Sequence, residues 1–341
     1  MAIPTLLVVS FISFTIMRYD VTIPAMYIPL GPTHYVGLLH SVQIKNPINP
    51  LAELKQNPAI SKAAYQQEVE RLGLDKPFVV QYGLWLKNMV SLPPDLGLSF
   101  SGEKVSSLVM QRLPNTILLN VIVLVLTWAI ALPMGVYAAV HWRSKADNLM
   151  AFLSSLSMGL PTFIMALLLA LICVKTRILP VGGLTGENFD ELNFFGKAWD
   201  LGLHLALPVI VLTLSSLAGL QRQMRGNLLE VLGANYIRTA RAKGLPERQV
   251  IYKHALRCAI NPMVTLLGFE FASLFSGAAL VEMILRYPGI GSLALEAVRQ
   301  TDTNLSMVVL TLGALVLILG NLLADILLRF ADPRIASEGY S

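Results

Sequence analysis

The segment from residue 235 to residue 262, NYIRTARAKGLPERQVIYKHALRCAINP, concentrates the side chains most able to do chemistry. Residues 222–257 hold eight basic and two acidic residues, a net charge of +6 in a chain whose total is +5. A lipid-facing segment would not tolerate these charges. Guanidinium groups pair strongly with carboxylates, so the segment is typical of a docking surface for an acidic partner. An ordinary basic cytoplasmic loop is the alternative.

The same segment predicts two short helices joined at a glycine. Small apolar and basic residues alternate over 235–243, and Gly244 is placed to end the first helix in the left-handed conformation. Pro246 suits the first position of a second helix, and Glu247 follows where a helix N-terminus favours an acid. The expected result is a compact knob outside the membrane.

Motifs for catalysis are missing from the sequence. It contains no GxxxxGK[ST] nucleotide motif, and its five histidines lack metal-ligand spacing. Cys173 and Cys258 fall at opposite ends of different apolar runs, so no disulfide framework is implied. We therefore expect no catalytic residue, metal site or cofactor in this chain, and an ATP-driven motion would need a separate motor protein.

The composition predicts an all-α polytopic membrane protein. Hydrophobic residues make up 55% of the chain and charged residues 14%, with a mean hydropathy of +0.62. Apolar runs of about 20 residues are long enough to cross a bilayer as helices. Six transmembrane helices are expected, at residues 2–17, 113–140, 149–174, 204–220, 260–285 and 305–330. Pro133 and Pro161 are expected to kink the second and third of them.

These spans set the predicted domain organisation. A first transmembrane helix (1–18) precedes an extracytoplasmic insertion (19–112), whose start is rich in proline and tyrosine and suits an irregular lid or short strands. A transmembrane core (113–330) contains the loop 222–259 between its fourth and fifth helices, and a cytoplasmic tail (331–341) follows. Basic residues concentrate in the short loops, which places both termini in the cytoplasm. The first span lacks a basic leader and is expected to be retained; whether the N-terminus is complete stays open.

A polar stripe on the fifth span could line a polar path through the membrane. Glu270 lies near mid-span, where an ionisable group is costly and suggests function. Ser273 and Gly277 share its helical face, and Ser276 lies nearby. The alternative is a structural carboxylate that is protonated or hydrogen-bonded to a neighbouring helix.

Two further groups are candidates for a gate or an interface. Glu282, Pro288 and Gly289 form a tight outer turn after the fifth span, which suits either an extracellular gate or a plain structural turn. Asn321 and Asp325 are spaced i, i+4 near the inner end of the last span, where interfacial pairing is expected.

At this point the sequence resembles a known family. YIRTARAKGL followed by HALRCAINP is similar to the cytoplasmic EAA loop of ABC-importer permeases, in particular their dipeptide, oligopeptide and nickel branch. With Gly244 as the pattern's glycine, Arg238, Thr239 and Ala240 occupy the EAA positions, and the second alanine alone is kept. The phrases LGLDKPFVVQY, RLPNTILL, VEMILRYPGIGSLALEAV and NLLADILLRFADPRIA extend the resemblance over most of the chain.

The resemblance implies a permease subunit of a bacterial inner-membrane importer for peptides or a related small solute. Such a subunit pairs with a second permease chain, usually a different homologue, and receives substrate from an extracytoplasmic binding protein. Two ATPase subunits carry ATP and magnesium and contact the loop; nucleic acid is not a partner. By this resemblance the ATPase contact comprises Arg238, Thr239, Ala240, Arg241, Lys243, Gly244 and Leu245.

Two other classes remain as alternatives. An ATP-independent channel or secondary transporter would work without partners, although the sequence shows no internal repeat. An intramembrane enzyme would need paired aspartates, a Ser/His pair at one depth or HExxH, and none of these occurs in the sequence. Copurification of ATPase subunits would distinguish an ABC-importer permease from a channel, a secondary transporter or an intramembrane enzyme. The transported solute is not determined by the sequence.

Overall fold

The computed structural model describes residues 7–8, 10–11, 15, 27–31, 34–37, 61–73, 76–91 and 94–331. Its described residues form helices apart from one small hairpin and the connecting loops, and the chain divides into two compact units. One unit comprises 1–111 with 296–314, and the other 112–295 with 315–341. The first predicted span lies mostly, and the tail after residue 331 wholly, outside the described residues.

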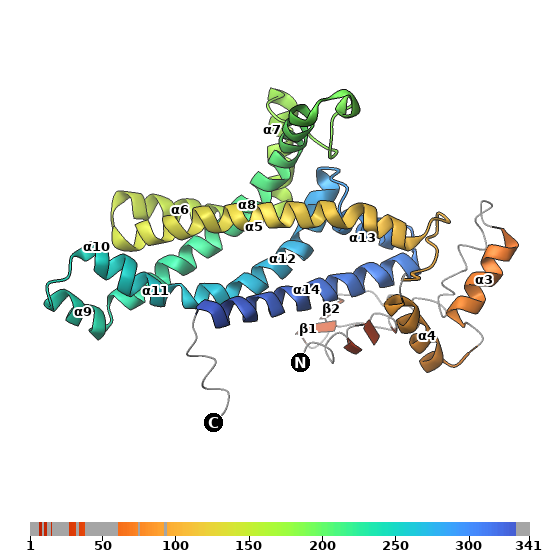
Figure 1. Cartoon of the computed structure of the whole chain (residues 1–341), viewed down its shortest axis with the longest axis horizontal. Helices are drawn as coiled ribbons and strands as arrows, with labels where there is room; N and C mark the ends of the chain where they lie inside the picture. Colours follow the sequence, from red (N-terminus) through yellow and green to blue (C-terminus); the bar gives the residue numbers. More distant parts are fainter. Residues whose placement is uncertain are drawn as a thin grey trace. The chain divides into compact units, whose positions relative to one another are not determined.

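The first unit begins with a two-stranded hairpin. Strand β1 (Tyr27–Gly31) pairs antiparallel with β2 (His34–Gly37). The sequence-based prediction allowed either an irregular lid or short strands in this segment, and short strands are present. Helices α3 (Lys62–Leu72) and α4 (Phe78–Val90) follow (Figure 1). They correspond to the polar run and to the amphipathic run of the insertion.

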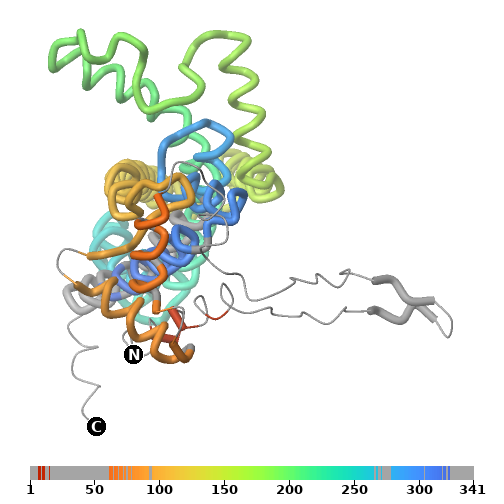
Figure 2. The backbone as a smooth tube through the Cα atoms, turned by 90° about the vertical axis from the view of Figure 1, so that its right-hand side faces the viewer, coloured from red at the N-terminus to blue at the C-terminus, as the bar shows by residue number. Residues whose placement is uncertain are grey.

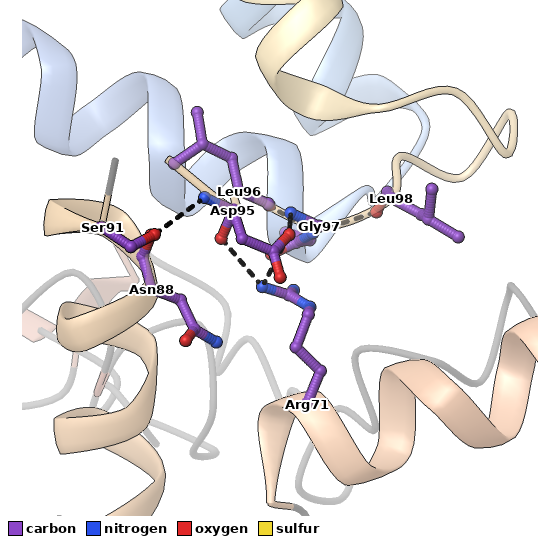
Figure 3. Close-up of polar contacts among 8 residues, drawn as sticks. Arg71, Asn88, Ser91, Asp95, Leu96, Gly97 and Leu98 are labelled. Atoms are coloured by element: carbon purple, nitrogen blue, oxygen red, sulfur yellow. Dashed lines mark hydrogen bonds and ion pairs between the residues drawn. The ribbon is translucent and has the colours of Figure 1, made fainter. Parts of the chain in front are cut away.

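Side chains from three elements fix the loop that follows α4. Arg71 at the end of α3 points at the main chain of Asp95 and donates to its carbonyl oxygen at 3.1 Å (Figure 3). Asn304, in the first turn of α14 (Thr303–Ala331), donates to two carbonyl oxygens of the same loop at 3.0 Å. Asp302 accepts from the hydroxyl of Ser99 at 2.6 Å and from the main chain of Leu305 at 2.9 Å, so it also caps α14.

The second unit is built from long apolar helices, shown with their order in Figure 1. They are α5 (Val105–Val140), which begins in the first unit, and α6 (Lys145–Gly159), α7 (Thr162–Thr176), α8 (Phe194–Leu232) and α12 (Asn261–Ile284). The 3-10 turn η1 (Phe189–Glu191) precedes α8. Among the described residues α5 and α8 are long and apolar enough to cross a membrane, and the bent pair α6–α7 makes a third candidate. A shorter apolar stretch spans Asn304–Val316 in α14. The six-span arrangement therefore stays a prediction.

The third predicted span differs from the sequence-based expectation of one kinked helix. It is two helices, α6 and α7, that meet at an angle of 100°, and Figure 2 shows α7 projecting away from α5 and α6. Pro161 has no N–H group to donate, and it restricts the residue before it to extended conformations. Leu160 accordingly has φ −102° and ψ 121°. In contrast, α5 continues as one helix through Pro114 and Pro133.

The fourth predicted span is a much longer helix than its apolar part. Helix α8 has 39 residues, because hydropathy locates only the segment that lipid can surround while polar turns extend the helix at both ends. Helices α5 and α8 approach closely at Gly135, where an added Cβ would lie 2.7 Å from the Met224 side chain. Small residues permit this kind of close helix packing in membranes.

Candidate coupling loop and outer turn

The predicted glycine stop of the first loop helix is confirmed. Helix α9 (Asn235–Ala242) ends, and Gly244 follows with φ +77°. Its N–H donates to the carbonyl of Arg241 at 2.9 Å, and the N–H of Leu245 donates to the carbonyl of Ala240 at 3.4 Å. This pair of bonds is the Schellman arrangement, which satisfies the last carbonyls of a helix.

The second loop helix begins one residue later than expected. Pro246 has ψ 140° and is the N-cap, while Glu247 is the first residue of α10 (Glu247–Gln249). The carbonyl of Pro246 accepts from the N–H groups of Gln249 and Val250 at 2.8 and 3.1 Å, as an N-cap does. The prediction of Pro246 at the first helical position was thus wrong by one residue, whereas Glu247 in the first turn is confirmed. A π-helical turn η2 (Val250–Ala255) and α11 (Leu256–Ala259) complete the loop.

One face of this loop is an apolar anchor, which the sequence reasoning did not assign. Ile237, Val250 and Ala255 are fully buried. They belong to one cluster with residues at the ends of three long helices: Ala131, Val136 and Ala139 of α5, Leu220, Met224 and Leu228 of α8, and Met263 of α12. The loop is therefore held to the helices that it would have to move.

The opposite face is polar and exposed. Arg238, Thr239 and Lys243 are exposed on and just after α9. Arg241 instead forms a two-point ion pair with Glu247, with nitrogen–oxygen distances of 2.7 and 3.1 Å. The Arg241 guanidinium lowers the pKa of the Glu247 carboxyl. In this structure the Arg241 guanidinium is thus paired within the loop and braces its two helices. Its place in a partner contact stays a prediction.

A second ion pair holds the neighbouring helices. Asp147, in the first turn of α6, accepts from Arg225 of α8 at 2.7 and 2.8 Å and from the main chain of Arg143 at 2.9 Å. Only 2% of the Asp147 side chain is exposed. Arg225, one of the eight basic residues counted over 222–257, is therefore paired within the helices. The sequence feature that could have drawn attention to Asp147 is the pattern Ser144–Asp147, in which an acid lies three residues after a helix N-cap.

The turn between α12 and α13 (Ile290–Arg299) encloses Glu282. This carboxylate is fully buried and accepts from the hydroxyl of Thr116 on α5 at 3.0 Å and from the main chain of Ser292 at 2.8 Å. The Thr116 oxygen in turn accepts from the N–H of Ile290 at 2.7 Å. The turn is thereby fastened to α5 through the buried Glu282 carboxyl group and the Thr116 hydroxyl.

Two further bonds close the same turn. The Asn115 side chain donates to the carbonyl of Pro288 at 2.9 Å, and the Tyr287 hydroxyl donates to the carbonyl of Asn115 at 2.8 Å. An added Cβ at Gly289 would collide with the Glu282 carboxylate, and one at Gly291 would lie 2.5 Å from Cα of Ala279. The predicted tight backbone is present, and close approach is the reason for its glycines.

The other candidate residues are only partly described. Glu270 is half-buried on α12, a continuous helix that keeps the spacing of the predicted polar stripe. The side chains of Ser273, Ser276, Gly277, Asn321 and Asp325 lie outside the described part of the structure. Their proposed roles in a path, a gate or an interface stay predictions.

A buried polar stripe on α5 was missed by the sequence reasoning. Asn120 is fully buried, and neither polar atom of its side chain has a hydrogen-bond partner; the Thr127 hydroxyl, at i+7, is in the same state. Unsatisfied buried polar groups in native proteins need an explanation, such as bound water or a functional role. The signal was available in the sequence, because Asn120 interrupts the otherwise apolar run ILLNVIVLVL.

Among the described residues, no group of three His, Cys, Asp or Glu side chains could hold a metal ion. The described polar features of the second unit include ion pairs, helix caps and exposed basic groups. Such features suit transmission of force and docking.

Comparison with known proteins agrees with this geometry. Residues 131–337 match the family described as "Binding-protein-dependent transport system inner membrane component". The oligopeptide transport system permease protein AppB of Bacillus subtilis is 37% identical over 338 residues, covering 98% of this chain and 96% of its own. A probable peptide ABC transporter permease, y4tP of Sinorhizobium fredii, is 36% identical over 270 residues, covering 78% of this chain and 83% of its own.

A third relative, the oligopeptide transport system permease protein OppB of Mycobacterium bovis, is 32% identical over 295 residues, covering 84% of this chain and 90% of its own. With the apolar helices α5 and α8, these matches identify a multi-pass inner-membrane protein, a transport component and not an enzyme. The chain belongs to the family of binding-protein-dependent transport system inner membrane components, the permease subunits of ABC importers.

Proposed function

We propose that this chain forms half of the translocation path of an ATP-driven importer for peptides or a related small solute. The relatives named as oligopeptide permeases support the substrate class. The observation that carries the coupling role is the two-faced loop, with an apolar face buried against α5, α8 and α12 and an exposed basic face. A partner that pushes on the basic face would move the helix ends directly.

The partners follow from the family and from this loop. Two ATPase subunits with ATP and magnesium would contact Arg238, Thr239, Ala240, Lys243, Gly244 and Leu245, with Arg241 bracing the contact through Glu247. A second, homologous permease chain would complete the path, and an extracytoplasmic binding protein would deliver the solute. Six spans with both termini in the cytoplasm would place the loop on the ATPase side.

The path itself is proposed to run along α12 and α5. Glu270, Ser273, Ser276 and Gly277 would contribute from α12, and the unsatisfied Asn120 and Thr127 support a hydrated stripe on α5. The turn around Glu282, Pro288 and Gly289 would act as the outer gate. Asn321 and Asp325 would pair at an inner interface.

Copurification and reconstituted transport test this function. The tagged chain, expressed with its partner subunits, should bring down ATPase subunits, and uptake of a peptide in proteoliposomes should stop without ATP. Charge reversal of the exposed basic pair, Arg238→Glu with Lys243→Glu, should release the ATPase. The matched reversal of another exposed pair, Lys175→Glu with Arg177→Glu at the end of α7, should not. ATP-independent flux through the chain alone would overturn the proposal.

A further inference from the structure

A groove of about 640 Å³ lies between the end of α5 and the coupling loop. Leu132, Val136 and Val140 of α5 form one apolar wall, and Ile251 and Leu256 form the other. Its volume lies in the range of small-molecule sites. The groove therefore offers an extended apolar slot beside the loop, not a polar pocket.

The lining of the groove also includes polar and aromatic residues. Arg248, Tyr252, Tyr137 and His141 all line it. The ring of Tyr137 stacks on that of His141 with centroids 4.2 Å apart. Within the described part of the chain Arg248 is exposed and has no acidic side chain within ion-pair distance, since the four ion pairs found there involve other residues. The Arg248 guanidinium is thus an exposed positive charge, without an ion-pair partner among the described residues, at the mouth of an apolar slot.

Neighbouring residues place this mouth at a membrane surface. The apolar helix α5 ends at Val140, and the next residues are His141, Trp142 and Arg143. The indole of Trp142 is 56% exposed, with the Arg143 guanidinium 4.4 Å from its ring centre. Exposed tryptophan and tyrosine beside basic residues are typical of the boundary between lipid tails and headgroups.

We propose that this groove binds an anionic phospholipid of the leaflet on the loop side, with an acyl chain in the slot and the phosphate at Arg248. A basic site between helices and beside an aromatic belt matches the chemistry of an acidic headgroup joined to an apolar tail. Ile251 and Leu256 belong to the coupling loop, so the lipid would brace the loop against α5. Only this last consequence rests on the proposed function; the binding site does not.

Native mass spectrometry of the intact permease complex tests the proposal. The probes are phosphatidylglycerol and phosphatidylcholine with identical acyl chains, together with glycerol 3-phosphate as a free headgroup. One basic residue contributes about 1 kcal/mol to an acidic lipid, which is about a fivefold change in affinity. We expect wild type to hold phosphatidylglycerol about fivefold more tightly than phosphatidylcholine, and Arg248→Gln to abolish that difference. The free headgroup should not compete at equal concentration.

Matched variants separate the groove from general charge and fold effects. Arg257→Gln removes the same charge from an exposed residue of the same loop that does not line the groove, and it should keep the preference. Val140→Trp fills the slot and should weaken both lipids, whereas Val125→Trp, at an exposed residue outside the groove, should weaken neither. Equal binding of the two lipids by wild type, or an equal loss in Arg257→Gln, would overturn the proposal. The lipid-binding measurement does not use ATP. It can therefore be interpreted even if the proposed coupling of the loop to an ATPase is wrong.

Discussion

The coupling loop and the outer turn both connect helices and both contain glycine and proline, yet their glycines have opposite surroundings. An added Cβ at Gly244 would meet nothing within 4 Å, so this glycine serves only the backbone conformation at φ +77°. An added Cβ at Gly291 would press on Ala279, and one at Gly289 on Glu282. There is free space beside Gly244 in the loop, whereas residues of the turn itself occupy the space beside Gly289 and Gly291.

This difference separates a surface for a partner from a self-contained structure. The Glu282 carboxyl group and the neighbouring main-chain groups have hydrogen-bond partners within the turn and on α5. On and just after α9 the basic side chains of Arg238 and Lys243 are exposed, whereas the fully buried residues of the loop are apolar. Substitutions in the turn should therefore affect folding, and substitutions on the loop's outer face should affect coupling.

The largest effect is expected from Gly291→Ala. The new methyl group meets main-chain atoms that cannot move aside, and overpacking of this kind costs about 1–3 kcal/mol. Thermal unfolding in detergent should show a clearly lower midpoint. Gly219→Ala on α8, where a Cβ would meet nothing within 4 Å, is the matched control and should not destabilise the protein. Equal midpoints for the two variants would contradict the close packing of the turn.

A smaller loss of stability is expected from Gly244→Ala. The left-handed backbone costs a residue with a side chain about 1 kcal/mol, with no collision added. Gly244→Asn should recover part of that loss, because asparagine tolerates this conformation better. If the alanine and asparagine variants are destabilised equally, the left-handed backbone conformation is not the reason for a glycine at this position. The same unfolding assay measures all three proteins.

The ion pair between Arg241 and Glu247 should give a still smaller, pH-dependent contribution. The pKa of Glu247 is lowered in the folded protein, so this stabilisation is present above the ordinary glutamate pKa and is lost as the pH falls through the lower, folded value. Because the pair is exposed, we expect about 0.5 kcal/mol or less. Unfolding midpoints between neutral and acidic pH should show this component in wild type. Glu247→Gln and Arg241→Gln should each remove it, and its persistence in either variant would refute the pairing.

No loss of stability is expected from Asn120→Leu, which lies one helical turn beyond Thr116 on α5. Replacing an unsatisfied buried amide by an apolar side chain of similar size is neutral or stabilising. Peptide uptake should nevertheless fall if this stripe is hydrated during transport. Normal uptake by a fully stable variant would remove α5 from the proposed path.

The sequence predicted the features that depend on local chemistry. Gly244 ends α9 as expected, Glu247 lies in the first turn of α10, and the apolar runs form helices. It did not predict features that depend on partners distant in the chain. The pairing of Asp147 with Arg225 joins residues 78 positions apart, and Asp302 reaches back 203 positions to Ser99. The 100° break at Pro161 was underestimated as a kink, because a proline alone does not set the angle.

Photocross-linking from the exposed face of α9 tests the central claim most directly. A benzophenone amino acid replaces Thr239 in the coupling loop or, as the control, Glu296, an exposed residue of α13 after the outer turn. Irradiation of the intact complex in membranes should yield an adduct with the ATPase subunit from position 239 and none from position 296. An ATPase adduct from position 296, or its absence from position 239, would contradict the assignment of this loop as the ATPase contact.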